Sequence, residues 1–381
     1  MTTPRARALR DLGQSVWLDY IHRQELASGH FAALVRDQGV VGVTSNPTIF
    51  QQAIATGDTY DASIERGLSA GLAGPELFER LAVEDIQAAC DQLAAIHAES
   101  GGLDGRVSIA VSPRLAGDTA GTIAEARRLH REVARPNVMV KVPATAAGLP
   151  AITALTAEGI CVNVTLIFSL ARYEQVMEAW LAGAETRAAA GQPLDRVFSV
   201  ASFFVSRVDT KVDKALEAAV ATLPAGDPRR AELEQARGLA AVANARLAYA
   251  RFRQVFDGAR FTALKARGAR LQRPLWASTS TKNPAYRDTL YVDDLIGADT
   301  VNTMPPQTLA AFNDHGTVRV TIGDDLEAAR ALFRRLPALG IPLESLIGEL
   351  EQEGVVAFAK SYDALLETLE SRRQSLAGRA R

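Results

Sequence analysis

The chain has 381 residues, of which 48% are hydrophobic and 23% are charged. These proportions are ordinary for a globular protein that buries a substantial core, and they argue against extended disorder. The formal net charge is only −2 and both signs are mixed along the chain. This pattern argues against a nucleic-acid-binding surface.

The sequence shows no targeting or membrane-spanning segment and no metal-binding pattern. The first residues lack an apolar core, and no apolar run approaches about 18 residues, so we expect no membrane association. Two cysteines, Cys90 and Cys161, are too few for a disulfide framework, and a cytoplasmic location is expected. Five scattered histidines without ligand spacing predict no zinc site.

The first predicted strand, residues 15–19, is short and apolar and ends in the carboxylate of Asp19. A charged residue at the carboxyl end of a barrel strand lies where such folds place their chemistry. An amphipathic helix is predicted to follow over residues 22–37.

The second predicted strand starts at Gly39 and runs into Ser-Asn-Pro. Pro47 forces Asn46 into an extended conformation and stops the strand, so the Asn46 amide is predicted to face the cavity at the strand end. The alternative is that Ser-Asn-Pro is only a turn. Residues 51–105 exceed what one barrel connection needs and are interpreted as a helical insertion, with a long helix near residues 75–100.

A third strand is predicted over residues 106–111 and a fourth over residues 137–145. The fourth strand places a single lysine, Lys141, within a run of valine and methionine. Burying an ammonium group costs several kcal/mol unless the group is paired or loses its proton. Lys141 is therefore a candidate nucleophile for a carbonyl carbon.

A less specific interpretation of Lys141 stays open, in which its side chain reaches solvent at the strand end or pairs with a carboxylate. The chain has 42 lysine and arginine residues, but only six are lysines. Arginine cannot form a Schiff base because its guanidinium stays protonated. Because this chain otherwise uses arginine for positive charge, a lysine within a buried strand is stronger evidence for a chemical role than it would be in a lysine-rich chain.

The fifth predicted strand, residues 159–165, places Asn163 and Thr165 on one face. Polar groups on the inner face of a barrel need partners from the protein, water or a ligand. The sixth strand is predicted over residues 196–200. It is followed by Ser202 and Arg207, which could bind an anion at a helix start.

The last two strands are predicted over residues 274–277 and 300–302. After the seventh strand, residues 278–284 carry four hydroxyls and a lysine that could bind phosphate, although a solvated turn is equally compatible with this composition. Eight short strands alternating with helices predict an α/β fold, a parallel (β/α)8 TIM barrel. We expect one domain over residues 1–381, with helical insertions near residues 51–105 and 209–270 and a C-terminal helical extension.

Several motifs resemble transaldolases, particularly the long bacterial form, over nearly the whole chain. They occur in the same order as in that family. The matching segments read V-T-S-N-P-T-I-F (residues 43–50), V-K-V-P-A-T (140–145), N-V-T-L-I-F-S (163–169), W-A-S-T-S-T-K-N-P (276–284) and V-N-T-M-P-P (301–306). The resemblance implies an imine-forming aldolase barrel that transfers a dihydroxyacetone unit between phosphorylated sugars without a metal or organic cofactor.

The resemblance also implies roles for individual residues. Lys141 is similar to the Schiff-base lysine of the family, and Asp19 to the carboxylate that takes and returns the proton of the carbon-4 hydroxyl. Asn46 and Asn163 resemble the amides that hold hydroxyls of the dihydroxyacetone unit. Thr165 resembles the residue that positions the catalytic water.

The substrate phosphate is implied to lie near the sixth and seventh strands. Ser202 and Arg207 match the phosphate-binding positions, with Ser278 and Lys282 assisting, although the alignment near Lys282 is loose. Phe204 matches the phenylalanine of transaldolases, where related aldolases that release free dihydroxyacetone carry tyrosine. The implied partners are phosphorylated sugars, and a monomer or homodimer is expected.

One catalytic position departs from the family pattern. The third strand of most members carries a glutamate that works with the threonine and a water, whereas this chain has Ala110. Loss of a positioned acid–base group costs roughly 10² to 10⁴ in rate. Three explanations stay open: an engineered substitution, a natural paralogue that uses another group, or a paralogue with different phosphosugar chemistry. Because only this catalytic position departs while its surroundings match, we expect a slowed transaldolase, and a non-catalytic phosphosugar-binding barrel is the remaining alternative.

Overall fold

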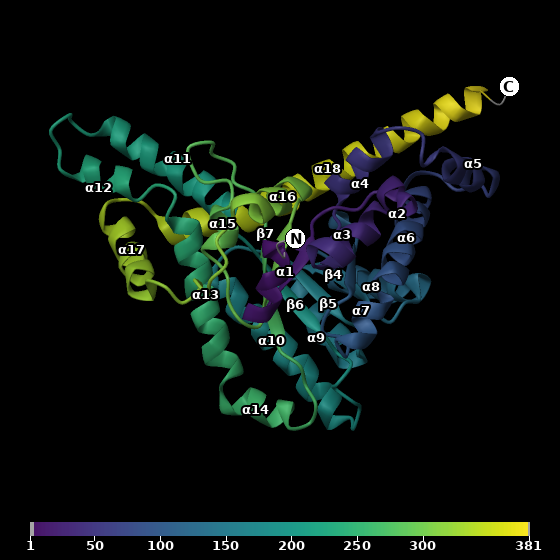
Figure 1. Ribbon diagram of the computed structural model, residues 1–381, viewed down its shortest axis with the longest axis horizontal. Helices are drawn as coiled ribbons and strands as arrows, with labels where there is room; N and C mark the ends of the chain where they lie inside the picture. Colours follow the sequence, from purple (N-terminus) through teal and green to yellow (C-terminus); the bar gives the residue numbers. More distant parts are fainter. Residues whose placement is uncertain (1–3, 380–381) are drawn as a thin grey trace.

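Eight parallel strands close into a barrel at the centre of the computed structural model, which describes residues 4–379 (Figure 1). Each strand pairs with the next in the chain, and β8 pairs with β1. The closed barrel confirms the predicted (β/α)8 fold. The strands are β1 (Gln14–Leu18), β2 (Val40–Val43), β3 (Arg106–Ala110), β4 (Val138–Pro143), β5 (Val162–Ile167), β6 (Ser199–Phe204), β7 (Gln272–Ala277) and β8 (Thr300–Met304).

Helices surround the barrel and also fill the two long connections after β2 and β6. Those before β5 are α1 (Arg5–Ala8), η1 (Leu9–Leu12), α2 (Arg23–Ser28), α3 (His30–Gln38), α4 (Pro47–Ala55), α5 (Asp61–Ser69), α6 (Gly74–Gln92), α7 (Ala94–Glu99), η2 (Pro113–Leu115), α8 (Thr119–Val133) and α9 (Gly148–Glu158). Those after β5 are α10 (Leu170–Ala189), α11 (Ser206–Thr222), α12 (Arg229–Gln235), α13 (Ala240–Phe256), α14 (Ala259–Lys265), α15 (Leu290–Asp293), α16 (Pro306–His315), α17 (Leu326–Ala338) and α18 (Leu343–Arg379).

The barrel strands are buried along almost their whole length because helices cover their outer faces and side chains fill the interior. Space inside the barrel is tight. A Cβ atom added to Gly42 on β2 would lie 2.6 Å from the indole of Trp17 on β1. Glycine at this position therefore lets the tryptophan fill the barrel interior.

Several element boundaries differ from the sequence-based expectation, including that of the fifth strand, which was predicted over residues 159–165 and is Val162–Ile167. The helix predicted over residues 22–37 is two helices, α2 and α3, because Gly29 between them is left-handed with φ 82°. The long helix predicted near residues 75–100 is likewise divided at Leu93 into α6 and α7. The sixth strand begins at Ser199, later than predicted, and extends to Phe204.

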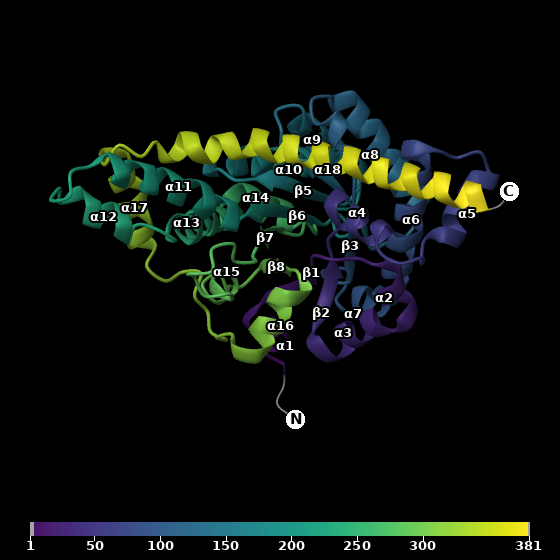
Figure 2. The ribbon, with the colours of Figure 1, turned by 90° about the horizontal axis from the view of Figure 1, so that it is seen from above.

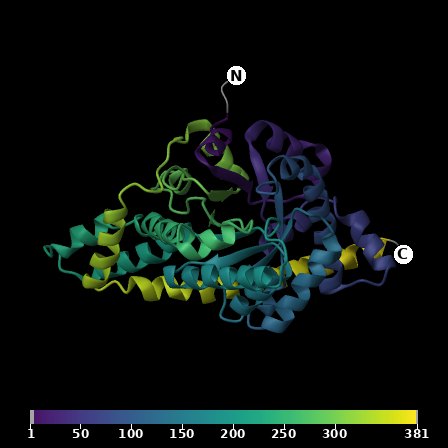
Figure 3. The same cartoon turned by 90° about the horizontal axis from the view of Figure 1, so that it is seen from below.

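The helix α18 crosses the carboxyl ends of the barrel strands. Figure 2 shows it running across most of the width of the molecule in front of the strands, and Figure 3 shows it from the opposite side. It contacts α4, α5, α6, η2, α11 and the end of β5. No helix within residues 4–379 is both long enough and apolar enough to cross a membrane.

Candidate active site

A cavity of about 970 Å³ opens at the carboxyl ends of the barrel strands. It collects most of the site residues predicted from sequence, which come from five different strands or the loops after them. These residues are Asp19, Asn46, Lys141, Ser202, Phe204, Arg207, Ser278 and Lys282. Ligand sites of barrel enzymes lie at this end.

Lys141 lies in the middle of β4 and is only 5% exposed. Its Nζ atom donates one hydrogen bond, at 3.4 Å, to the carbonyl oxygen of Ser45. Burial lowers the pKa of the Lys141 amine below its ordinary value, and the charge of Asp19 opposes this shift. The amine is therefore favoured in its neutral, nucleophilic form compared with an exposed lysine.

Asp19 follows β1 and is oriented by a hydroxyl on the neighbouring strand end. Thr44 Oγ1 donates to Asp19 Oδ1 at 2.7 Å and also lies 2.8 Å from Thr303 Oγ1. The sequence analysis missed Thr44. Its position two residues before Asn46, on the same face of an extended strand, is the signal that could have identified it.

Asn46 serves as a helix cap and as a cavity residue at the same time. Its backbone is extended, with φ −157° and ψ 167°, as expected before Pro47. Its Oδ1 atom accepts a hydrogen bond from the Ile49 amide at 3.0 Å and caps α4. Asn46 also lines the main cavity. The turn interpretation and the cavity interpretation are therefore compatible.

Asn163 is placed differently from the other predicted residues. It is completely buried on β5 and is not part of the main cavity lining. Its Nδ2 atom donates to Ser108 Oγ at 2.9 Å, and its Oδ1 atom accepts from Ser202 Oγ at 2.7 Å. Asn163 thus links β3, β5 and β6 beneath the cavity floor.

Thr165 and Ala110 lie around a second, much smaller cavity of about 20 Å³, which Lys141 also lines. Ala110 on β3 is in register with Lys141 on β4, so their side chains are neighbours. Among the residues that the structure describes, Thr165 Oγ1 is buried without a hydrogen-bond partner. The cavity can hold about one water, which Thr165 and Lys141 could both contact.

The other end of the main cavity is cationic. Arg207 lies in the first turn of α11 with its guanidinium 5.8 Å from the ring centre of Phe204. Lys282 faces the same cavity, and burial together with the charge of Arg207 lowers its pKa. Ser278 contributes a hydroxyl 2.9 Å from Ser206 Oγ. Two cations and several hydroxyls form a suitable site for a phosphate group.

The helix α18 contributes apolar walls. Phe358 lines both cavities, and Val355 lines the small one.

Within residues 4–379, no three histidine, cysteine or acidic side chains are grouped so that they could hold a metal ion.

Comparison with known proteins agrees with this geometry. The family model described as transaldolase/fructose-6-phosphate aldolase matches residues 16–369. The chain is 51% identical to a transaldolase of Thermobifida fusca, over 94% of this chain and 95% of that protein. It is 50% identical to a transaldolase of Mycolicibacterium paratuberculosis, over 96% of both chains, and 50% identical to transaldolase 1 of Streptomyces coelicolor, over 96% and 94%. The chain therefore belongs to the transaldolase/fructose-6-phosphate aldolase family.

Proposed function

We propose that this protein is a transaldolase that moves a dihydroxyacetone unit from a ketose phosphate to an aldose phosphate through a Schiff base on Lys141. In the forward direction, sedoheptulose 7-phosphate and glyceraldehyde 3-phosphate would give erythrose 4-phosphate and fructose 6-phosphate. The observation that carries the proposal is a buried amine of lowered pKa in a cavity whose other end is cationic. We further propose that the enzyme is a single-domain, cytoplasmic monomer or homodimer.

The proposed reaction begins at the substrate ketone. The neutral Lys141 amine attacks the keto carbon to form a carbinolamine, and loss of water gives a protonated imine. Asp19 accepts the proton of the carbon-4 hydroxyl while the bond between carbons 3 and 4 breaks. The electron pair of that bond is held as an enamine on Lys141, and the aldose phosphate leaves. Addition of a second aldose phosphate and the reverse steps release the new ketose.

Binding at the cationic end would orient the substrate for these steps. Arg207, Lys282 and Ser278 are proposed to hold the phosphate. Asn46 is proposed to bind a hydroxyl of the dihydroxyacetone unit. Because Asn163 hydrogen-bonds to Ser108 and Ser202, we propose that it acts on the substrate mainly through the Ser202 hydroxyl.

Transfer requires that the enamine is not protonated by loose water before the acceptor arrives. Phe358 and Val355 on α18 supply apolar cover next to Lys141. The small cavity beside Thr165 would hold the one water needed to form and break the carbinolamine. With Ala110 in place of a carboxylate, this water lacks an adjacent base, so turnover is proposed to be slow.

The decisive experiment is reduction with borohydride in the presence of fructose 6-phosphate, followed by peptide mass mapping. The adduct should appear on Lys141 and be absent from Lys141→Met. Lys282→Met is the matched control, since Lys282 faces the same cavity and its loss should leave labelling of Lys141 intact. Labelling elsewhere, or none, would refute the Schiff-base mechanism.

Ala110 also supports a second candidate, a barrel that binds phosphorylated sugars without turning them over. A coupled assay for glyceraldehyde 3-phosphate released from fructose 6-phosphate, with erythrose 4-phosphate as acceptor, separates the two. Turnover that disappears in Lys141→Met would establish catalysis. Saturable substrate binding with no turnover would establish the binding barrel.

A further inference from the structure

Two buried aspartates on α11, Asp209 and Asp213, lie one helical turn apart and contact the same distant segment. Asp209 Oδ2 accepts a hydrogen bond from the Tyr291 hydroxyl at 2.8 Å. Asp213 Oδ2 accepts one from the Tyr286 hydroxyl at 2.6 Å. Both tyrosines belong to the connection between β7 and β8. We refer to Asp209, Asp213, Tyr286 and Tyr291 as the aspartate–tyrosine clamp.

The remaining carboxylate oxygens of the clamp bind the backbone that leads into α13. Asp213 Oδ1 accepts from the Gly238 amide at 2.9 Å, and Asp209 Oδ1 accepts from the Ala241 amide at 2.7 Å. Gly238 has φ 71°, and a Cβ atom there would lie 2.7 Å from the ring of Tyr286. The clamp therefore joins three segments that are far apart in sequence, and each of its four carboxylate oxygens has a donor.

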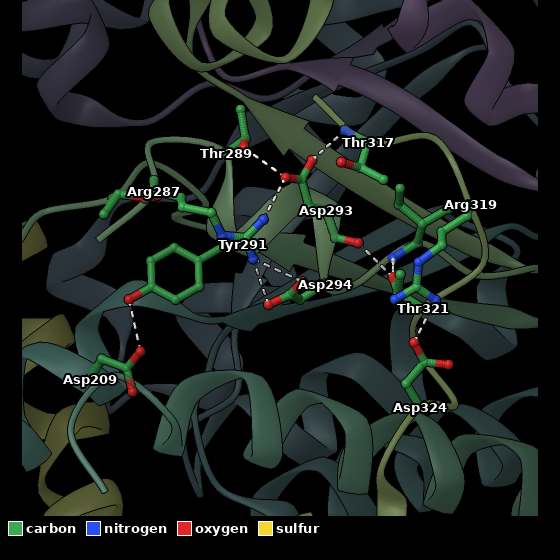
Figure 4. Close-up of polar contacts among 12 residues, drawn as sticks. Asp209, Arg287, Thr289, Tyr291, Asp293, Asp294, Thr317, Arg319, Thr321 and Asp324 are labelled. Atoms are coloured by element: carbon green, nitrogen blue, oxygen red, sulfur yellow. Dashed lines mark hydrogen bonds and ion pairs between the residues drawn. The ribbon is translucent and has the colours of Figure 1, made fainter. Parts of the chain in front are cut away.

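The connection between β7 and β8 is also fixed on its other side, as Figure 4 shows. Asp293, two residues after Tyr291, accepts hydrogen bonds from Thr289 Oγ1 at 2.7 Å, Arg287 Nη1 at 2.9 Å and the Thr317 amide at 2.9 Å. The tyrosines thus project toward α11 from a segment that is itself anchored. A hydrogen bond to such a segment can fix the position of α11 relative to it.

Both cations of the proposed phosphate site lie next to the clamp in sequence. Arg207 is two residues before Asp209, and Lys282 is four residues before Tyr286. Arg207 contributes to the lowered pKa of Lys282, so the two charges repel each other across the cavity. Like charges stay at a useful separation only when the surrounding structure holds their backbones in place.

We infer that the aspartate–tyrosine clamp is a set of positioning residues that fixes the spacing between Arg207 and Lys282 and thereby sets the affinity of the site for a phosphate group. This inference rests on the proposed function of Arg207 and Lys282. The clamp does not contact the cavity and takes no part in the reaction at Lys141. Its loss therefore weakens phosphate binding and leaves the chemical steps intact.

The test compares binding and turnover in Tyr286→Phe, Tyr291→Phe and the double variant. Isothermal titration gives the Kd for inorganic phosphate, and steady-state assays give KM and kcat with fructose 6-phosphate. We expect the double variant to raise Kd and KM by roughly tenfold while kcat changes by less than about twofold. Tyr286 is only half-buried, so Tyr286→Phe should fold in any case and show a smaller shift in the same direction.

A matched control is available near α6. The buried Tyr60 hydroxyl donates to Asp85 Oδ2 at 2.7 Å, so Tyr60→Phe removes the same kind of contact away from the cationic end. Asp209→Asn is the conservative variant, because an amide can still accept from Ala241 and can donate to Tyr291. We expect near-normal Kd in Asp209→Asn and in Tyr60→Phe, and a raised Kd in Asp209→Ala.

The inference is overturned if Tyr60→Phe raises Kd as much as the clamp variants at an equal loss of thermal stability. It is also overturned if the clamp variants lower kcat and leave Kd and KM unchanged. Titration with inorganic phosphate needs no turnover. A protein that fails the borohydride test can therefore still confirm or refute the clamp.

Discussion

Arg273 and Lys141 are both cationic side chains inside the barrel, but Arg273 lies near the start of its strand, Lys141 lies in the middle of its strand, and the two have different partners. Arg273, near the start of β7, donates through Nη2 to Ser15 Oγ at 2.6 Å and to the Thr300 carbonyl at 3.1 Å. Its Nη1 lies 3.5 Å from Asp104 Oδ1. Within residues 4–379, Lys141 donates only to one carbonyl, at 3.4 Å.

Burial lowers the pKa of both side chains, but only Arg273 has a carboxylate within ion-pair distance. A buried charge that stabilises a fold needs an opposite charge and several acceptors, since desolvation is otherwise uncompensated. Among the described residues, the two terminal nitrogens of Arg273 have a carboxylate, a hydroxyl and a carbonyl, although its Nε has no partner, whereas Lys141 has one carbonyl. The difference indicates that Arg273 stabilises the amino-terminal end of the barrel, and it supports the proposal that Lys141 is a reactive amine retained at a cost in stability.

The largest effect that would sharpen this comparison is expected for Lys141→Met. Turnover should fall by roughly 10⁴-fold or more, because the variant has no amine to form the imine. The free energy of unfolding should stay equal or rise at neutral pH, since a poorly paired buried amine is replaced by an apolar side chain. Coupled assays and urea unfolding measure the two quantities. Retained activity, or a marked loss of stability, would contradict this view of Lys141.

Arg273→Met should show the opposite behaviour. Removing one partner of a buried ion pair is expected to lower the free energy of unfolding by about 3 kcal/mol, because Asp104 is left buried without its cation. Adding Asp104→Asn should recover part of that loss, which makes the double variant the control. If Arg273→Met unfolds at the same urea concentration as the parent protein, the two buried cations do not differ in the way described.

Ala110→Glu tests whether the small cavity beside Thr165 lacks a base. A carboxylate beside the small cavity should raise kcat by roughly 10²-fold or more by activating the water near Thr165. Ala110→Gln has the same size without the acid and should give no such increase. An equal rate in all three proteins would mean that Ala110 is neutral for catalysis.

The smallest effect concerns Asp209, a third buried ionisable group. Burial raises its pKa to about 7, and its backbone and Tyr291 hydrogen bonds and the neighbouring Asp213 charge modify that shift. Because the folded-state pKa lies above the ordinary value, Asp209 contributes most stability below about pH 4, and this contribution is lost as pH rises toward 7.

Asp209→Asn cannot titrate and should lack this loss. Relative to the parent protein, its free energy of unfolding should gain on the order of 1 kcal/mol between pH 5 and pH 7. Urea unfolding at several pH values measures the difference. Parallel pH curves for the two proteins would show that Asp209 has an ordinary pKa in the folded state.

The barrel could be predicted from the sequence because each strand is a short apolar run between helices. The structure shows the same alternation of strands and helices. It also predicted that Lys141 is a buried lysine within an apolar strand. Helix breaks at Gly29 and Leu93 were missed. An amphipathic stripe can continue across a break, so periodicity alone does not reveal one.

Contacts between distant segments could not be predicted. The bonds of Asn163 to Ser108 and Ser202 join residues 55 and 39 positions away. The bond between Asp209 and Tyr291 spans 82 positions. A single sequence carries no signal for such pairs, because each partner, judged from its neighbours in the sequence, looks like a polar residue in contact with solvent. The position of Thr44 two residues before Asn46 could have placed it at the cavity, but its hydrogen bond to Asp19 depends on Asp19 being its neighbour on another strand.

The crossing of α18 over the strand ends has a consequence for biosynthesis. The ribosome makes α18 after every barrel strand, so the chain can close its barrel before Val355 and Phe358 reach Lys141. Until this helix docks, the small cavity beside Lys141 lacks its apolar wall. If Lys141 forms the proposed enamine, shielding on this side begins only when translation has passed residue 358 and the helix has emerged from the ribosomal tunnel.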